Sequence, residues 1–290
     1  MPGFPRVQLV PQPYDQLAFE VDGREWLRYH YGVATPKPYF SPVLGPAGRT
    51  ITRITHPHDP HGHGHHLSLW IAHHDVGGVS FWQPYMTKNR IVHDRIVKLT
   101  DGSAGELTLR SNWLADEKPL MMEERSWTFA PRFETMAGGG DGEYFLDVRL
   151  TLTPVAEKLL LGKTPFGFVA VRVAKTMGVA DGEGRIINSE GHLNEPQTHW
   201  QRAKWCDYSG FVNPGHEANG ITLMDHPANP RHPTHFHTRN DGWMGAAFAH
   251  TEAFELTRAQ PLVLRYRFWV HALWCDPVAT TAQWNAWSHS

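Results

Sequence analysis

The sequence is poor in cysteine and in charge, and it has no long apolar run. Its two cysteines, Cys206 and Cys275, are too few for the disulfide framework of a small secreted domain. Charged residues make up 19% of the chain and the formal net charge is -2, so the chain has no electrostatic attraction for nucleic acid or an anionic membrane. No apolar stretch approaches the length of a membrane span. We therefore expect neither nucleic acid nor a membrane as a partner.

The N-terminal residues and the overall composition indicate a globular cytoplasmic protein. Residues 1–6 lack the basic segment and apolar run of a secretory signal. A hydrophobic content of 41% over 290 residues is enough for a sizeable core. No repeat, low-complexity linker or break in composition divides the chain, so we expect a single domain over residues 1–290. The sequence is compatible with a homo-oligomer.

Short segments that alternate polar and apolar side chains fill most of the chain, which is the period of a half-buried strand. We expect strands at residues 6–10, 16–21, 24–31, 39–44, 50–54, 67–72, 90–99, 106–113, 119–129, 144–152, 168–174, 185–188, 203–209, 220–224 and 262–271. Gly138–Gly140 marks a flexible tip. One helix is predicted at Pro277–Trp287, with Asp276 as N-cap and proline at the first helical position. The pattern predicts an all-β fold, a large antiparallel β-sandwich with a short C-terminal helix.

Residues 56–75 carry eight of the twenty histidines of the chain and are the strongest candidate for a functional site. Imidazoles bind transition metals and exchange protons near neutral pH. If a cofactor is bound, these residues predict a divalent metal, zinc or similar, on two or three of His63, His65, His66 and His73. No standard metal-binding motif is present, however, and a solvated histidine loop is the alternative.

A second polar segment, residues 225–239, is stiffened by proline and reads as a loop. It carries candidate ligand-binding side chains, namely Asp225, His226, Asn229, Arg231, His235, His237 and Arg239. A rigid surface loop with mutually satisfied polar groups is the alternative interpretation. We predict that this segment and the histidine stretch meet at one cleft.

Further candidates lie on predicted strands. Glu123 and Glu124 face opposite sides, so at most one can join a cleft, and Arg125 would share the face of Glu123 and pair with it. Asn188 lies at the polar end of a predicted strand, and Asp207 lies between two aromatic residues. Trp70, Trp82 and Trp205 are candidates to stack against a sugar, although tryptophan also fills cores.

Several motifs together resemble a known family. They are residues 63–70, 74–82, 188–191, 205–210 and 225–231, and they resemble the uncharacterised bacterial family often labelled "methane oxygenase PmoA". The label itself does not fit, because the methane monooxygenase subunit is an integral membrane protein. The family looks more like the galactose-mutarotase-like supersandwich group, which contains epimerases, lyases and glycoside hydrolases.

Two functional classes follow from these observations. The first is an enzyme that acts on a carbohydrate by acid–base chemistry, through hydrolysis, elimination or epimerisation, with or without a metal. In it His65 or His66 transfers one proton and Asp225 or Glu123 the other. The ligand is then bound by Trp70, Asn188, Asp207, His226, Asn229, Arg231, His237 and Arg239. The second class is a non-catalytic carbohydrate-binding module.

Overall fold

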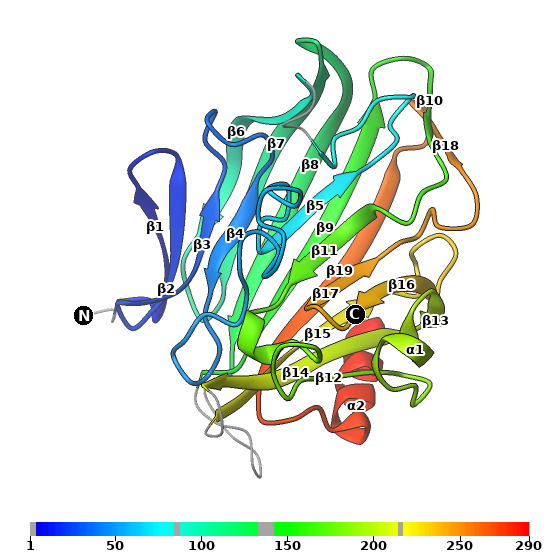
Figure 1. Ribbon diagram of the computed structural model, residues 1–290. Coiled ribbons are helices and arrows are strands. Elements are labelled where there is room, and N and C mark those ends of the chain that lie inside the picture. The colour runs from blue at the N-terminus through cyan, green and yellow to red at the C-terminus, as the bar shows by residue number, and fades with distance from the viewer. Residues whose placement is uncertain (1–3, 84–87, 133–141, 214–216, 290) are drawn as a thin grey trace.

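A computed structural model describes residues 4–83, 88–132, 142–213 and 217–289. The predicted tip at Gly138–Gly140 lies outside these residues. The described chain forms two large antiparallel sheets that face each other, with a short helix near the C-terminus (Figure 1).

Within the described residues, the first sheet has nine strands. In spatial order they are β1 (Val7–Gln12), β2 (Gln16–Val21), β3 (Arg24–His30), β4 (Tyr39–Val43), β5 (Leu69–His73), β11 (Gly167–Arg172), β17 (Trp243–Ala246), β16 (Thr234–Arg239) and β13 (Gln201–Ala203). Strands distant in sequence, such as β5 and β11, are neighbours in it, which brings separate motifs to one face.

The second sheet has eight strands in the part of the chain that the structure describes. In order they are β12 (Arg185–Asn188), β14 (Trp205–Asn213), β15 (Glu217–Asp225), β19 (Leu262–Ala272), β9 (Tyr144–Pro154), β8 (Lys118–Pro131), β7 (Gly105–Ala115) and β6 (Arg90–Thr100). The smaller elements are the pair β10 (Lys158–Leu161) and β18 (Phe254–Thr257), a 3-10 turn at Lys175–Met177, α1 (Asn194–Thr198) and α2 (Pro277–Ser288).

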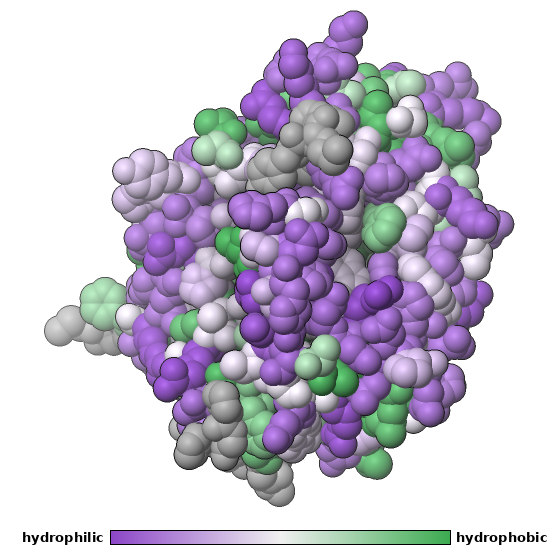
Figure 2. All heavy atoms as spheres, viewed as in Figure 1, coloured by the Kyte–Doolittle hydropathy of each residue, from purple (hydrophilic) through white to green (hydrophobic). Residues whose placement is uncertain are grey.

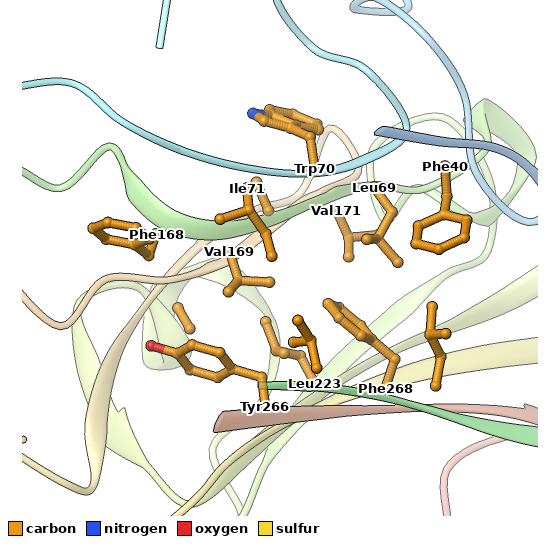
Figure 3. Packing of buried hydrophobic residues seen from close by; sticks show 14 of the residues in the cluster. Phe40, Leu69, Trp70, Ile71, Phe168, Val169, Val171, Leu223, Tyr266 and Phe268 are labelled. Atoms are coloured by element: carbon orange, nitrogen blue, oxygen red, sulfur yellow. The ribbon is translucent and has the colours of Figure 1, made fainter. Parts of the chain in front are cut away.

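The core lies between the two sheets and follows the alternation of the strands. Leu69 and Ile71 of β5 point toward the second sheet, where Tyr266 and Phe268 of β19 pack against the first sheet (Figure 3). Trp70 lies between Leu69 and Ile71 in sequence and points to the opposite, outer face. This outer face of the nine-stranded sheet carries the candidate site.

The expected all-β antiparallel sandwich with a short C-terminal helix is confirmed. Helix α2 begins as predicted, with the Asp276 carboxylate accepting from the amides of Val278 and Ala279. Other expectations were wrong. Residues 50–54 form isolated bridges and no strand, α1 was missed, and residues 234–239 of the presumed loop are strand β16. Within the described residues, no helix is long and apolar enough to cross a membrane.

Candidate functional site

A pocket of about 560 Å³ lies on the outer face of the nine-stranded sheet, beneath the histidine-rich segment that connects β4 to β5. The face of the molecule seen in Figure 2 is mainly hydrophilic, with small, scattered hydrophobic groups. The pocket is lined by His56, His63, His65, His66, His74, Trp82, Gln83, Phe166, Arg172, Trp200, His237, Arg239, Asp241 and Trp243. Aromatic and imidazole rings thus make up most of its wall.

Small residues in the sheet make room for the large rings of the pocket. Ala170 of β11 lies opposite Gly245 of β17 on one side and opposite Trp70 of β5 on the other. Two residues along, Arg172 lies opposite Trp243. Because alternate residues share a face, these side chains all project from the outer face, and the small ones leave space above the sheet.

The histidine segment is folded by hydrogen bonds from its own side chains. Nδ1 of His56 accepts from the amides of His58 and Asp59, at 3.0 and 3.1 Å, and Nε2 of His56 lies 2.7 Å from Oδ2 of Asp241. Both ring nitrogens of His56 are therefore occupied. This ring fixes the segment to the turn that follows β16, and it has no nitrogen left for a ligand.

His63 is held by an aspartate of the same segment. Its Nδ1 lies 3.0 Å from Oδ2 of Asp59, whose other oxygen accepts from the amide of Gly62 at 2.8 Å. That amide holds the pKa of the Asp59 carboxyl below its usual value. A side chain at position 62 would collide with the Asp59 carboxylate, which explains the glycine. Because an ionised carboxylate only accepts, Nδ1 of His63 carries a proton and Nε2 is available.

His66 is held by a buried arginine. Nε and Nη2 of Arg172 donate to Nδ1 of His66, and Nη1 of Arg172 pairs with Oδ1 of Asp241 at 2.7 Å. A ring nitrogen that accepts from a guanidinium has no proton, so the proton of His66 lies on Nε2. Burial, reinforced by the charge of Arg172, holds the pKa of His66 well below its usual value. His66 therefore presents a neutral N–H donor.

Asp241 is the acidic partner in this network. Burial raises the pKa of its carboxyl, but the attraction of Arg172 and the hydrogen bonds from His56 and Arg172 outweigh that effect and lower the pKa overall. Asp241 is thus ionised near neutral pH. Both of its carboxylate oxygens are engaged, which makes it a fixed charge and a poor proton acceptor.

Two more histidines of the pocket are neutral near neutral pH. Burial lowers the pKa of His65 to about 3, with a smaller effect from the charge of Lys37. Burial likewise lowers the pKa of His237 to about 3. A neutral imidazole donates a hydrogen bond through one nitrogen and accepts one through the other. A sugar hydroxyl can also donate and accept, so the two groups are suited to each other.

Trp200 enters the pocket from an unusual backbone conformation. Its φ is 60°, a left-handed value that costs a bulky residue about 1–3 kcal/mol. Its ring stacks on His250, with ring centroids 4.2 Å apart, and lies 4.3 Å from the ring of His237. The surrounding rings hold Trp200 in a fixed position at the pocket wall.

The structure brings together some of the residues predicted from sequence and separates others. His63, His65, His66, His237 and Arg239 line the pocket. The first half of the 225–239 segment lies elsewhere, because Asp225 ends β15 in the second sheet whereas β16 belongs to the first. The chain crosses from the second sheet to the first within this segment, so the two halves of the segment lie in different parts of the molecule.

The residues before this crossing form a buried structural network. The Asp225 carboxylate accepts from Asn229 at 2.8 Å and from the amide of Thr234 at 3.0 Å, and it lies 2.7 Å from Nδ1 of His232. Burial raises the pKa of Asp225, but this carboxyl does not line the pocket. Asp225 and Asn229 therefore brace the crossing, which corrects their expected roles at the ligand.

His226 and Arg231 also have structural roles. Nδ1 of His226 accepts from the amide of Ala228, and its ring packs on Trp287 of α2. The Arg231 guanidinium donates to the carbonyls of Glu252 and Ala253, at 2.7 and 2.8 Å. Neither residue lines the pocket, so neither binds a ligand there.

Glu123 lies inside the sandwich, away from the pocket. Its carboxylate pairs with Nε of Arg125 at 2.6 Å, as the shared strand face predicted, and accepts from Trp113 at 2.8 Å. Both partners of the ion pair are almost completely buried. Glu123 is therefore a core residue. The face of β8 that carries it is the inner face of the sandwich.

Asn188 and Asp207 are structural as well. Oδ1 of Asn188 accepts from the amides of Glu190 and His192 and so closes the turn after β12. The buried Asp207 carboxylate accepts from Thr222 at 2.7 Å and lies 2.8 Å from Nε2 of His271. Both side chains satisfy local polar groups and lie outside the pocket.

Of the three candidate stacking tryptophans, Trp82 lines the pocket. Trp70 is buried behind His66, with ring centroids 5.3 Å apart. Trp205 belongs to a separate cluster that packs against α2. Trp70 and Trp205 are thus packing residues.

The predicted metal site is not supported by the positions of its ligands. His73 shares the inward face of β5 with Leu69 and Ile71, and its Nε2 lies 3.0 Å from the carbonyl of Gly162. Nδ1 of His63 and Nδ1 of His66 are already engaged. Among the residues that the structure describes, no three His, Cys, Asp or Glu side chains are arranged to hold a metal ion.

Several pocket residues escaped the sequence interpretation. Arg172 carried the clearest signal, since it is a charged residue within the apolar run of residues 168–174. His56 and His74 belonged to the histidine stretch but were given no role. Trp200 and Asp241 lie in short turns whose patterns gave no indication of a site.

Comparisons with known proteins place the chain in a family without an established activity. A family model described as "Family of unknown function (DUF6807)" matches residues 16–285. The resemblance to the family labelled methane oxygenase PmoA is thereby corrected, because a different family model matches nearly the whole chain. No curated protein matches the chain.

The chain also has a distant similarity to a solved structure, described as "Crystal structure of GH36 alpha-galactosidase AgaB from Geobacillus stearothermophilus". The sequence identity is 10% and the TM-score is 0.44. The match covers 91% of this chain but 40% of the other, so the chain spans about two fifths of that protein's length.

Proposed function

This chain belongs to the family of unknown function DUF6807, and we propose that it is an enzyme that binds a sugar or sugar derivative in the pocket and transfers protons with its histidines. The observation that carries the proposal is the Asp59–His63 pair at a pocket walled by aromatic rings.

The walls of the pocket suit a sugar. Its volume of about 560 Å³ falls in the range of roughly 300–1,000 Å³ that is typical of small-molecule sites. Trp82, Phe166 and Trp200 offer apolar surface against which the C–H face of a sugar ring can pack. The neutral ring of His65 can exchange hydrogen bonds with hydroxyl groups, and Nε2–H of His66 can donate one.

His63 is the best candidate for proton transfer. A carboxylate that holds Nδ1–H orients the imidazole and leaves Nε2 to take a proton from the substrate or return it. His66 complements it, because a neutral imidazole with a fixed Nε2–H can donate a hydrogen bond to a developing negative charge on oxygen. This assignment replaces the expected pairing of a histidine with Asp225 or Glu123.

The acidic groups favour one class of reaction over another. Most glycoside hydrolases use two carboxyl groups that flank the scissile bond. Among the described residues that line the pocket, Asp241 is the one carboxylate, and both of its oxygens are engaged. The proposal therefore favours epimerisation or elimination by imidazole over hydrolysis by paired carboxylates.

A non-catalytic sugar-binding module is the second candidate function. The observation that favours it is the low pKa of His65 and His237, about 3 for each, because such groups are poor proton shuttles near neutral pH. In this alternative His63 only binds, and no product forms.

A screen for product separates the two functions. Purified protein is incubated with free sugars, keto-sugars and glycosides, and products are followed by proton NMR. We expect turnover of at least one sugar, with a loss of about 10²–10⁴-fold in His63→Ala. His61→Ala is the matched control, since His61 is exposed in the same segment and does not line the pocket. Binding of a sugar by the wild type without any product, weakened in His63→Ala but not in His61→Ala, would support the module and contradict the enzyme.

A further inference from the structure

Among the residues that the structure describes, one lysine lies buried next to the pocket and has no charged partner. Lys37, in the connection between β3 and β4, is fully buried. Its Nζ donates to the carbonyl of Trp82 at 2.6 Å and lies 5.5 Å from the ring centroids of both Trp70 and Trp82. The ammonium form of Lys37 has three donors, and its contacts with described residues are a neutral carbonyl and two aromatic rings.

The other cations of the pocket are already neutralised. Arg172 pairs with Asp241 at 2.7 Å, and Nε of Arg239 lies 3.0 Å from Glu195. None of the ion pairs between described residues includes Lys37, and burial alone holds its pKa well below the usual value. A buried cation without a counter-ion is unfavourable and is usually paired. The described residues therefore leave the protonated form of Lys37 without a counter-ion, and an anion bound nearby would stabilise that form.

The charge of Lys37 acts on the pocket itself. Trp82, whose carbonyl and ring contact Lys37, forms part of the pocket wall. The positive charge of Lys37 also contributes to the low pKa values of His65 and His66, which both line the pocket. A negative group on a ligand beside these rings would interact with the same charge.

We propose that the sugar bound in this pocket carries a negatively charged group, as a hexuronate or a sugar phosphate does. The inference rests on the proposed function and specifies its substrate class. The anion would lie on the Trp82 side, where it would favour the protonated form of Lys37. Arg239 is half-exposed at the pocket and pairs through Nε, so its terminal nitrogens can contact the same group.

Matched ligands test the inference directly. Isothermal titration calorimetry compares a neutral hexose with the hexuronate and the hexose 6-phosphate of the same configuration, in the gluco and galacto series. We expect one anionic sugar to bind at least about tenfold more tightly than its neutral counterpart, and the better anion identifies the group as carboxylate or phosphate.

Substitutions test whether Lys37 causes the preference for an anionic sugar. Lys37→Met keeps the size of the side chain without its charge and should remove most of the preference for the anion. Lys158→Met is the control, because Lys158 is exposed and pairs with Glu255 away from the pocket. If Lys37→Met does not fold, Arg239→Gln, at a half-exposed position, should still reduce the preference. Neutral and anionic sugars bound equally by the wild type would overturn this inference alone, whereas failure of every sugar to bind would contradict the proposed function as well.

Discussion

Arg172 donates two hydrogen bonds to Nδ1 of His66, from Nε at 3.3 Å and from Nη2 at 3.0 Å. The two residues are 106 positions apart in the sequence, on β11 and at the end of the histidine segment. Since the same guanidinium also pairs with Asp241, one buried side chain fixes the ring of His66 and the turn that holds His56.

This relationship predicts the tautomer of His66. In the wild type, the ring should carry its proton on Nε2, because Nδ1 accepts from a guanidinium that cannot lose its proton. In Arg172→Met both tautomers should be populated. Nitrogen-15 NMR of the histidine rings measures this directly, with His61 as an internal control. A wild-type ring protonated on Nδ1 would contradict the assigned network.

Asp241 should stabilise the fold in a pH-dependent way. Its folded-state pKa lies below the usual value of 3.8, so its contribution is present above about pH 4 and is lost as the pH falls through the folded-state pKa. We expect Asp241→Asn to lower the free energy of unfolding by about 1–3 kcal/mol at pH 7. The difference from wild type should shrink below pH 4. Urea unfolding from pH 3 to pH 7 tests this, and a constant difference would argue against the ion pair.

His271 should contribute stability with the opposite dependence on pH. Burial lowers its pKa, but the nearby Asp207 charge and the hydrogen bond to it raise the pKa overall above 6.5. Its contribution is therefore present below pH 6.5 and is lost as the pH rises through the folded-state pKa. As the pH rises through this range, the free energy of unfolding of the wild type should fall, and that of His271→Gln should fall less. Parallel pH profiles of the two proteins would contradict a charged His271.

Glu123 should matter for stability and not for the ligand. Glu123→Gln leaves the Arg125 guanidinium buried without its counter-ion, which costs about 3–5 kcal/mol of unfolding free energy. Glu124→Gln is the control, since Glu124 faces solvent on the same strand and pairs with Arg110 at an exposed site, worth about 1 kcal/mol or less. Denaturant unfolding gives both values. A Glu123→Gln variant of normal stability but weaker sugar binding would return Glu123 to the site.

The sequence predicted the architecture better than the site. Alternating strands and the capped helix at Pro277 are local patterns, so the sandwich and α2 could be read directly. The histidine segment stood out by composition. Alternation showed that Glu123 and Glu124 face opposite ways, but it could not tell which face is the interior, since that depends on the other sheet.

The remaining site residues depend on tertiary contacts. The crossing between sheets separates Asp225 from His237, although twelve positions of polar, proline-rich sequence suggested one loop. Arg172 and Asp241 act through partners more than 60 residues away, a relationship that no local pattern contains. Lys37 looked like an ordinary loop lysine, and its burial became visible only once Trp70 and Trp82 were placed around it.

The most direct test of the account asks where a sugar binds. Protein labelled with nitrogen-15 at tryptophan is titrated with the best ligand from the screen, and the indole signals are assigned by single substitutions. The account predicts that the signals of Trp82, Trp200 and Trp243, which line the pocket, shift with ligand concentration, while those of Trp269 and Trp284 near α2 do not. Shifts at Trp269 and Trp284 with an unchanged Trp82 would place the ligand elsewhere and contradict the assignment of this pocket.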